Sequence, residues 1–418
     1  MGAKLDGIER VAVIGSGVMG AGIAAHCANA GCEVMLLDIV PEGVEDRDSL
    51  AKGAITKMLK SDPEMLMHKS YVKRITAGNI EDHLELLKSY DWVVEVIIEN
   101  LEIKRSLYER LTEHLGTNTI LSSNTSTLPR SALTNGMPHD IASRFLITHF
   151  FNPPRYLPLL EVVAGPEVDD SVVARFAEFG DVQLGKRVTF CNDTPGFIGN
   201  RMLAGYTRQA GEIILQGATP YQVDNAILGF GMPMGPFQMN DLVGLDLGWR
   251  ARKLNGIKPE DVPITARVAD KLCEMDRYGQ KTSRGYYIYP EGSRAGQADP
   301  EVVQMVEETS AELGIERRPI DDDEVLKRCL YPMINEGARS LEDGIAIRPC
   351  DIDIVYINGY GFPEVTGGPM YWADQIGLDN ILADIKKFEA EYGGDTWKPA
   401  PLLEKLVAEG KKFASLQG

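Results

Sequence analysis

The sequence predicts an α/β, doubly wound N-terminal domain followed by two duplicated all-α helical domains, with boundaries at 1–191, 192–316 and 317–418. Three observations lead to this prediction. Short apolar runs alternate with helical stretches up to about residue 191, which is typical of a parallel sheet covered on both faces. The remaining residues have helical patterns. These residues also repeat themselves, which indicates duplication of a helical unit.

The first element pair is a strand and a helix joined by glycines. Residues 10–15 read RVAVIG, a β-branched run, and glycines follow at positions 15, 17 and 20. The segment AGIAAHCANAG has small apolar residues at helical spacing, and a second strand, EVMLLD, follows at 33–38. Strand, glycine-rich turn, helix and strand within about 30 residues form the βαβ unit of a parallel sheet.

Later strands are expected at 92–98, 119–124, 144–151, 158–165 and 186–191, with helices at 101–115 and 169–184. Residues 41–72 have helical character, and Pro63 is expected at a bend between two helices. Lys52, Lys57 and Lys60 fall close to one face of the first helix. They form either a solvated lysine face or a cationic patch for the phosphates of a substrate.

The C-terminal helices begin with NDTPGFIGNR, where Asp193 or Thr194 is the expected helix cap. The repeat is then read from matched positions. Four residues recur at one constant spacing: Arg201 as Arg328, Gly217 as Gly344, Asp224 as Asp351, and Ile227 as Ile354. After a short insertion, a second set recurs at a slightly longer spacing: Gly235, Pro236, Asp241, Gly244, Leu245 and Asp246 return as Gly368, Pro369, Asp374, Gly377, Leu378 and Asp379.

Composition limits the classes of partner. The 418 residues correspond to two or three domains, and 43 basic against 61 acidic residues give a net charge of −18. Such a surface disfavours binding to nucleic acid or to an anionic membrane. The six cysteines lack C-x-x-C or zinc-like spacing, no run is long enough to span a bilayer, and no signal peptide precedes the first strand. We therefore expect a cytoplasmic protein without a metal site.

The glycine-rich turn carries the strongest chemical signal. Gly15, Gly17 and Gly20 stand between a strand and a helix, and the next strand ends at Asp38. In this context glycines permit a tight turn and close approach of a pyrophosphate, and the helix N-terminus supplies donors. Asp38 is placed to bind a ribose 2′-hydroxyl, so NAD is preferred to NADP. The alternative is a glycine turn without a ligand.

His149 and Glu161 form the second candidate constellation. His149 lies near the carboxyl end of the apolar run RFLITHFF, and Glu161 interrupts another such run, PLLEVV. A buried carboxylate needs a partner, and two adjacent strands could bring the two side chains into contact. The carboxylate would orient the imidazole and leave its other nitrogen free as a base. The alternative is a core histidine with an unrelated glutamate.

Two weaker candidates are the polar run SSNTST at 122–127 and Asn200. The run follows a strand and offers hydroxyl and amide donors at the same sheet edge, although an ordinary polar loop has the same pattern. Asn200 lies at the start of the helix that joins the domains, where clefts form, although a locally bonded asparagine is the alternative.

These segments together resemble a known family. The segments are, in chain order, VAVIGSGVMGAGIAAHCANAG, VVEVIIENLEIK, SSNTSTL, THFFNPP, LLEVVAG, NDTPGFIGNR, GMPMGPFQMNDLVGLD and KTSRGYYIY. In this order they resemble the L-3-hydroxyacyl-CoA dehydrogenases of fatty-acid β-oxidation, whose first domain is of the Rossmann type. The second helical copy is similar to the extra C-terminal unit of multifunctional β-oxidation enzymes. No hydratase-like segment is visible, so the resemblance implies a stand-alone dehydrogenase or a part of a longer polypeptide or complex.

The resemblance implies a role for each matched residue. His149 would be the catalytic base and Glu161 its orienting partner, while Ser126 and Asn200 would hydrogen-bond the reacting oxygen. Lys52, Lys57 and Lys60 are candidates for the CoA phosphates, in a region that matches the family poorly. The implied cofactor-binding residues are Gly15, Gly17, Val18, Met19, Gly20, Asp38, Glu99, Lys104, Asn124, Ser126 and Asn152.

The expected function is NAD-dependent oxidation of an L-3-hydroxyacyl-CoA to a 3-ketoacyl-CoA. One alternative is oxidation of a free hydroxy or sugar acid on the same scaffold, and another is a non-catalytic NAD-binding or structural protein. A hydratase or thiolase is an expected partner or fusion. Because the second copy could occupy the surface through which stand-alone relatives dimerise, a monomer is expected.

Overall fold

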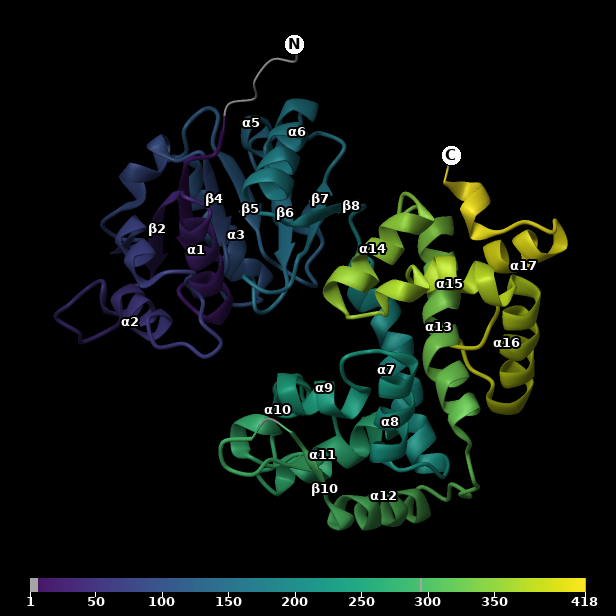
Figure 1. Cartoon of the computed structure of the whole chain (residues 1–418). Helices are drawn as coiled ribbons and strands as arrows, with labels where there is room; N and C mark the ends of the chain where they lie inside the picture. The colour runs from purple at the N-terminus through teal and green to yellow at the C-terminus, as the bar shows by residue number, and fades with distance from the viewer. Residues whose placement is uncertain (1–6, 294, 418) are drawn as a thin grey trace. The chain divides into compact units, whose positions relative to one another are not determined.

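The computed structural model describes residues 7–293 and 295–417, and its packing groups the chain into two units (Figure 1). The first unit comprises Met1–Asn200 and Ser340–Tyr360, and the second comprises Arg201–Arg339 and Gly361–Gly418. Residues 340–360 thus belong to the second helical copy in sequence but pack with the sheet of the first unit. The domain boundaries expected from the sequence, 1–191, 192–316 and 317–418, stay a prediction.

The first unit contains one eight-stranded sheet with the strand order β3-β2-β1-β4-β5-β6-β7-β8. All neighbours pair in parallel except β6 and β7, which are antiparallel. This is a doubly wound arrangement, as the sequence predicts. The strands are β1 (Arg10–Ile14), β2 (Glu33–Asp38), β3 (Ile75–Asn79), β4 (Trp92–Glu95), β5 (Ile120–Ser123), β6 (Phe145–Phe150), β7 (Leu159–Ala164) and β8 (Arg187–Cys191).

Helices cover both faces of this sheet (Figure 1). One face packs against α1 (Val18–Asn29), α2 (Ser49–Met58) and α6 (Asp170–Glu178), with Trp92 at the centre of a cluster that includes Phe150 and Phe176. The other face contacts α3 (Leu101–Thr112) through Tyr108 and Phe145, and it contacts α4 (Arg130–Thr134). Helix α5 (His139–Ala142) and the short helical turns η1 (Lys69–Arg74), η2 (Leu84–Ser89) and η3 (Phe179–Gln183) complete the connections.

Helix α14 (Pro349–Gly359) also packs against the sheet, on strands β7 and β8. Its last residue, Gly359, lies so close to Leu159 that a Cβ there would overlap the leucine side chain. The segment before it is bonded to the end of β8, because Asn192 N donates to Ile345 O at 2.9 Å. A helix of the second helical copy therefore covers strands β7 and β8, next to the antiparallel pair of β6 and β7.

The segment 41–72 differs from its prediction. It holds one α-helix, α2, and the start of the short turn η1. Residues 61–68 between them are not helical, so the expectation of two helices that meet at Pro63 is wrong. The backbone after α2 is bonded by side chains from elsewhere instead of by a helical ladder. Asn29 pairs with Met65 and Met67, and Arg155 donates to Glu64 O at 2.6 Å. Strand β3 was also not expected, since ITAGN is short and ends in turn-forming residues.

The second unit is helical apart from a two-stranded ribbon of β9 (Tyr287–Ile288) and β10 (Gln297–Ala298). None of the helices within residues 7–293 and 295–417 has the length and apolarity that crossing a lipid bilayer requires. The helices are α7 (Gly199–Gln216), α8 (Pro220–Phe230), α9 (Pro236–Val243), α10 (Asp246–Leu254), α11 (Arg267–Glu274), α12 (Pro300–Glu312), α13 (Asp322–Glu342), α15 (Pro369–Ile376), α16 (Leu378–Tyr392) and α17 (Pro401–Ala408), with the short turns η4 (Pro259–Asp261), η5 (Ile264–Ala266), η6 (Gln280–Thr282), η7 (Glu364–Thr366) and η8 (Phe413–Leu416).

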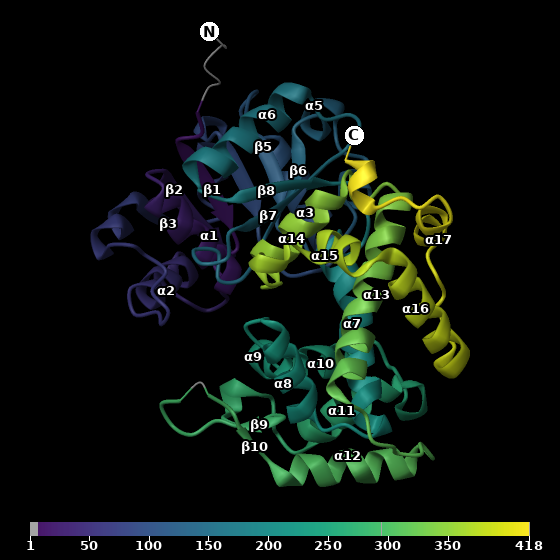
Figure 2. The ribbon, with the colours of Figure 1, turned by 45° about the vertical axis from the view of Figure 1, so that its right-hand side comes forward.

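The first helices of the two copies, α7 and α13, lie side by side (Figure 2). Arg201 pairs with Glu336 at 2.6 Å, and Arg328 donates to Gln209 at 3.0 Å. In the repeat, Arg201 corresponds to Arg328 and Gln209 corresponds to Glu336, so the same two positions meet twice with their roles exchanged. The two helical copies therefore pack on each other like the two halves of a two-fold symmetric pair.

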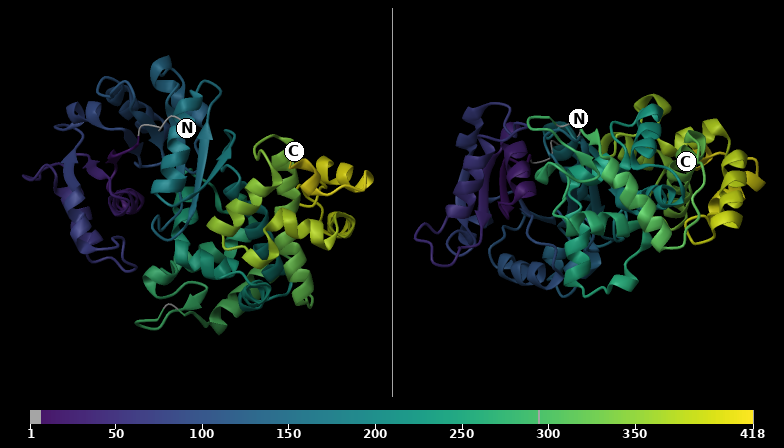
Figure 3. Two further views of the ribbon diagram at one scale, coloured as in Figure 1. Left: turned by 45° about the horizontal axis from the view of Figure 1, so that its top comes forward. Right: turned by 90° about the horizontal axis from the view of Figure 1, so that it is seen from below.

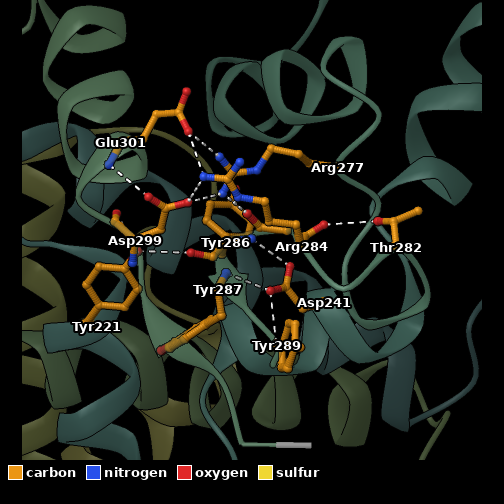
Figure 4. A network of polar contacts seen from close by, with 11 residues as sticks. Tyr221, Asp241, Arg277, Thr282, Arg284, Tyr286, Tyr287, Tyr289, Asp299 and Glu301 are labelled. Carbon is orange, nitrogen blue, oxygen red and sulfur yellow. Dashed lines mark hydrogen bonds and ion pairs between the residues drawn. The ribbon is translucent and has the colours of Figure 1, made fainter. Parts of the chain in front are cut away.

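Each copy also uses the same aspartate to hold the segment that ends it. In the second copy, whose C-terminal helices are yellow in Figure 3, Asp374 accepts hydrogen bonds from the N–H groups of Phe413 and Ala414 at 2.8 and 2.9 Å. Its counterpart Asp241 accepts from the backbone N–H groups of Tyr286 and Tyr287, both at 2.9 Å (Figure 4). The structure therefore supports the duplication inferred from the sequence.

Candidate active site

His149 and Glu161 are in direct contact. The register of β6 and β7 places them opposite each other, and His149 Nδ1 lies 2.8 Å from Glu161 Oε2. The glutamate is fully buried and the imidazole is 7% exposed. A carboxylate on Nδ1 favours the tautomer that carries its proton there, which leaves Nε2 as an acceptor. The contact predicted from the sequence is confirmed.

The second oxygen of Glu161 is held by the start of helix α7. The backbone N–H of Gly199 donates to Glu161 Oε1 at 3.1 Å, and the Gly199 carbonyl accepts from the Tyr356 hydroxyl at 2.9 Å. Both carboxylate oxygens are therefore bonded, as a buried charge requires. Phe151 lies beside the imidazole, with ring centroids 4.5 Å apart. The acid–base pair is thus held by a strand partner, a helix start and an aromatic ring.

The glycine turn fits a dinucleotide. Gly15 has φ +107°, and a Cβ on Gly20 would collide with the Gly15 carbonyl oxygen, so these two glycines bring the turn and α1 together. Gly17 has no other heavy atom within 4 Å of the position of a Cβ, so the space above it is open. It caps α1 without a side-chain hydrogen bond, which leaves the N–H groups of the first turn available to phosphate oxygens.

Asp38 ends β2 beside this turn. Its Oδ2 accepts from Ser16 N at 2.7 Å and from the Ser16 hydroxyl, and its Oδ1 accepts from Ile39 N at 2.8 Å. A carboxylate has about four acceptor positions, so it retains capacity for a ribose hydroxyl. Its negative charge would repel a 2′-phosphate. The residues present at the turn and at Asp38 thus fit NAD.

A buried ion pair lies at the carboxyl end of β4. Lys104, 1% exposed, donates to Glu95 Oε1 at 2.6 Å, and its Nζ lies 3.3 Å from Glu99 Oε2. Glu95 is fully buried and also accepts from the hydroxyls of Tyr108 at 2.6 Å and Ser123 at 2.7 Å. Glu95 is not among the residues predicted from the sequence, although it interrupts the apolar run WVVEVII just as Glu161 interrupts PLLEVV.

Glu99 links the lysine to the polar loop 122–127. It accepts from the hydroxyls of Thr125 and Thr127 and from Ser126 N at 3.3 Å. Burial alone would raise the pKa of Glu99, but the Thr125 hydrogen bond and the Lys104 charge outweigh it and lower that pKa. The carboxylate therefore stays ionised and fixes the loop that carries Ser126.

The loop also reaches the strand of the histidine, because Asn124 Oδ1 accepts from Phe150 N at 2.9 Å. Asn152 follows the end of β6, beside Pro153 and Pro154, and its side chain is exposed. Pro154 packs on Gly22 of α1, where a Cβ would lie 2.8 Å from the proline Cδ. This close packing ties the residues after His149 to the helix of the glycine turn.

Asn200 follows Gly199, the residue that holds Glu161, and it is bonded by the second helical copy. Its Oδ1 accepts from the Tyr360 hydroxyl at 3.0 Å. Tyr360 in turn packs on Phe151, with ring centroids 5.5 Å apart. Sequence reasoning did not find Tyr360, because it lies far along the chain from Asn200 and no local pattern predicts their contact.

The three candidate lysines differ from one another. Lys52 pairs with Asp46 at 2.7 Å and with Asp48 at 3.7 Å, so its charge is already shared by two carboxylates. Lys57 is exposed at the end of α2. Lys60 lies beyond the helix and lines a surface hollow of about 480 Å³ together with His68 and Lys69. They do not form one face of one helix.

Comparison with known families matches nearly the whole chain. Residues 10–194 match the NAD binding domain of 3-hydroxyacyl-CoA dehydrogenase, and residues 196–289 and 325–415 match its C-terminal domain. The chain belongs to the 3-hydroxyacyl-CoA dehydrogenase family. The two C-terminal segments matched agree with the two helical copies, and the NAD-binding domain of the family is present.

Similar proteins include longer enzymes. The peroxisomal bifunctional enzyme of Danio rerio is 36% identical over 96% of this chain, and the fatty acid oxidation complex subunit alpha of a Shewanella species is 31% identical over 99%. The chain spans 56% and 57% of the lengths of these relatives.

Solved structures of similar fold cover the chain as well. The 3-hydroxybutyryl-CoA dehydrogenase of Escherichia coli matches 97% of this chain and all of its own, with a TM-score of 0.76 and 26% identity. The dehydrogenase part of multifunctional enzyme 1 from C. elegans matches 96% of this chain and 90% of its own, with a TM-score of 0.70 and 26% identity.

Proposed function

We propose that this chain oxidises an L-3-hydroxyacyl-CoA to a 3-ketoacyl-CoA, with NAD⁺ as the oxidant. The observation that carries the proposal is the contact of 2.8 Å between His149 Nδ1 and Glu161 Oε2 at the carboxyl end of β6, in the same unit as a turn that fits a dinucleotide. Ligands of doubly wound sheets bind at that edge.

His149 Nε2 removes the proton of the substrate's 3-hydroxyl group. Glu161 stabilises the imidazolium that forms, and the N–H of Gly199 keeps the carboxylate in place. Ser126 and Asn200 donate hydrogen bonds to the reacting oxygen, which changes from hydroxyl to carbonyl. NAD⁺, held by the glycine turn and Asp38, would supply the hydride acceptor for C3. The chain's own contribution is to position the substrate and to move the proton.

The cofactor-binding set keeps its proposed roles. The turn from Gly15 to Gly20, with Val18 and Met19 at the start of α1, would bind the pyrophosphate, and Asp38 would bind the adenosine ribose. Glu99, Lys104, Asn124, Ser126 and Asn152 would line the nicotinamide side. Lys57 and Lys60 are the better candidates for CoA phosphates, because Lys52 already pairs with two carboxylates.

Partners and assembly follow from the same features. We propose an acyl-CoA substrate and a hydratase or thiolase as partner or fusion, since similar proteins are bifunctional enzymes or complex subunits. A monomer is favoured because α7 and α13 already pair within one chain. A cytoplasmic location stays a prediction.

A spectrophotometric assay tests the proposed function. NADH oxidation is followed with 3-ketoacyl-CoA substrates of several chain lengths, and a free 3-keto acid serves as the control. Turnover of the thioesters alone supports the proposal. Turnover of the free acid would favour the alternative dehydrogenase, and NADH binding without turnover of any substrate would favour a non-catalytic protein.

A further inference from the structure

The two helical copies contain matching turns, and at one of the two positions where these turns differ the second copy adds a hydroxyl group. GFGMP at 229–233 and GYGFP at 359–363 occupy equivalent places at the C-terminal ends of α8 and α14. They also pack reciprocally, because Gly231 faces Pro363 and Gly361 faces Pro233, with Cβ positions 3.2 and 2.5 Å from the respective proline Cγ atoms. Tyr360 is therefore the counterpart of Phe230, and it adds a hydroxyl group.

The two aromatic rings have different surroundings. Phe230 packs in the second unit on Phe362 and Trp372, with ring centroids 5.4 and 4.9 Å apart. Tyr360 stacks in the first unit on Tyr356, with ring centroids 4.8 Å apart, and donates its hydroxyl proton to Asn200 Oδ1. The oxygen that distinguishes Tyr360 from Phe230 is therefore used on a candidate active-site residue.

This hydrogen bond uses the oxygen of the Asn200 side chain and leaves its N–H groups available to donate to another acceptor. A carboxamide has an accepting oxygen and a donating nitrogen, and it can rotate to exchange them. A tyrosine hydroxyl whose proton is given to Oδ1 holds the amide in one orientation, with the N–H groups directed elsewhere. Burial and the charge of Glu161 raise the pKa of Tyr360 well above its usual value, so the hydroxyl keeps the proton that it donates.

We propose that Tyr360 is a positioning residue that orients Asn200 so that its N–H groups face the reacting oxygen. The inference rests on the proposed function, because it needs an oxygen that accepts from Asn200. It assigns to the second helical copy a part in the chemistry of the first unit. A donor held in place before the substrate arrives avoids the cost of reorganisation in the transition state.

The test compares Tyr360→Phe with the wild-type chain, using NADH and acetoacetyl-CoA as substrates. We expect kcat to fall about tenfold or more, with KM for acetoacetyl-CoA changed much less. The dissociation constant for NADH, measured by fluorescence titration, should stay as in the wild type. The midpoint of thermal unfolding should change little, because phenylalanine already occupies the equivalent position in the other copy.

Tyr221→Phe is the matched control. Tyr221 is also half-buried and its hydroxyl lies 3.0 and 2.8 Å from the carbonyl oxygens of Tyr286 and Asp299, to one of which it donates, but it belongs to the second unit. It should lower the unfolding midpoint without lowering kcat. If Tyr360→Phe behaves in the same way, its role is only structural and the proposal is overturned.

A double substitution separates action through Asn200 from any other effect. In an Asn200→Ala background, Tyr360→Phe should cause little further loss of kcat, because the group that it orients is gone. Equal losses in both backgrounds would overturn the proposal. If the wild-type chain does not turn over acetoacetyl-CoA or longer homologues, the proposed function itself fails, and the inference fails with it. Turnover by the wild type with an unchanged kcat in Tyr360→Phe rejects the role of Tyr360 alone.

Discussion

His149 and Glu161 face each other across the one antiparallel strand pair in a sheet whose other neighbours, among the described residues, are parallel. Directly opposite residues on such a pair have their side chains on the same face, about 4.5–5.5 Å apart at Cβ. The reversal of β7 therefore brings an acid from the middle of a buried strand to the imidazole near the carboxyl end of β6.

Replacing the proposed base should abolish turnover. His149→Gln keeps a polar side chain of similar size but has no nitrogen that can take a proton. General base catalysis contributes about 10²–10⁴-fold, so we expect kcat to fall by at least that range while the affinity for NADH stays nearly unchanged. The rate and the NADH titration are measured on the same preparation, and near-wild-type kcat would refute the role of His149.

Glu161→Gln tests the orienting carboxylate. The amide has one accepting oxygen for the two donors, His149 Nδ1–H and Gly199 N–H, and it lacks the charge that stabilises the imidazolium. We expect a kcat loss of about 10²-fold or more with a smaller change in KM. A result close to wild type would mean that hydrogen bonding, without the charge, is sufficient.

Two glycines of the turn should respond differently to the same substitution. Gly17→Ala adds a methyl group where the fold leaves open space, so the protein should unfold at its usual temperature but bind NADH at least about tenfold more weakly. Gly20→Ala forces a collision with the Gly15 carbonyl, so it should lower the unfolding temperature strongly. Unchanged NADH affinity in Gly17→Ala would exclude a close approach of the pyrophosphate.

The buried pair of Glu95 and Lys104 should show strong coupling. Lys104→Met leaves Glu95 buried without its cation, and such losses cost about 3–5 kcal/mol. Adding Glu95→Gln should restore part of the stability, because the unpaired charge is removed. Urea unfolding of the two single variants and the double variant measures the coupling, and simple addition of the two effects would show that the residues act independently.

His26 should make the first unit sensitive to acid. Burial, and the charge of Lys186, lower the pKa of His26 from 6.5 to about 4. The unfolded chain therefore takes up this proton first, and the folded state loses up to ~3 kcal/mol as the pH falls from 6.5 to about 4. His26→Gln, whose amide can replace the hydrogen bond to Leu184 O, should lose less stability over this range in thermal unfolding. Parallel curves for the two proteins would contradict this.

The parts of the fold that could be predicted from the sequence are those with strong local patterns. Apolar strands, the glycine turn and the helical repeat were identified, because each has a characteristic period or spacing. Strand β3 was missed because its five residues include Gly78 and Asn79, which seldom favour strands. The irregular chain after α2 depends on side chains from distant segments, such as Asn29, which no local pattern reveals.

The site shows the same division. His149 and Glu161 stood out as polar residues in apolar runs, and their contact followed from strand adjacency. The prediction that Asp193 or Thr194 caps the linking helix is wrong, because both precede the start of α7 at Gly199. The Asp193 carboxylate accepts from Ser131 N at 2.8 Å and so caps α4 instead. Helix α7 begins only at Gly199, where Tyr356 and Tyr360 meet it. Contacts of this kind depend on tertiary packing and are not encoded in neighbouring residues.

The packing of α14 on β7 and β8 has a consequence for how the protein is made. The two strands are complete by residue 191, yet the helix that covers them is translated only at residues 349–359. During synthesis, Leu159 and its neighbours therefore stay uncovered by α14 until the residues between β8 and α14 have also been translated. The nascent strands β7 and β8 therefore expose apolar surface until residues 349–359 have been made, and such exposed surface is prone to aggregation.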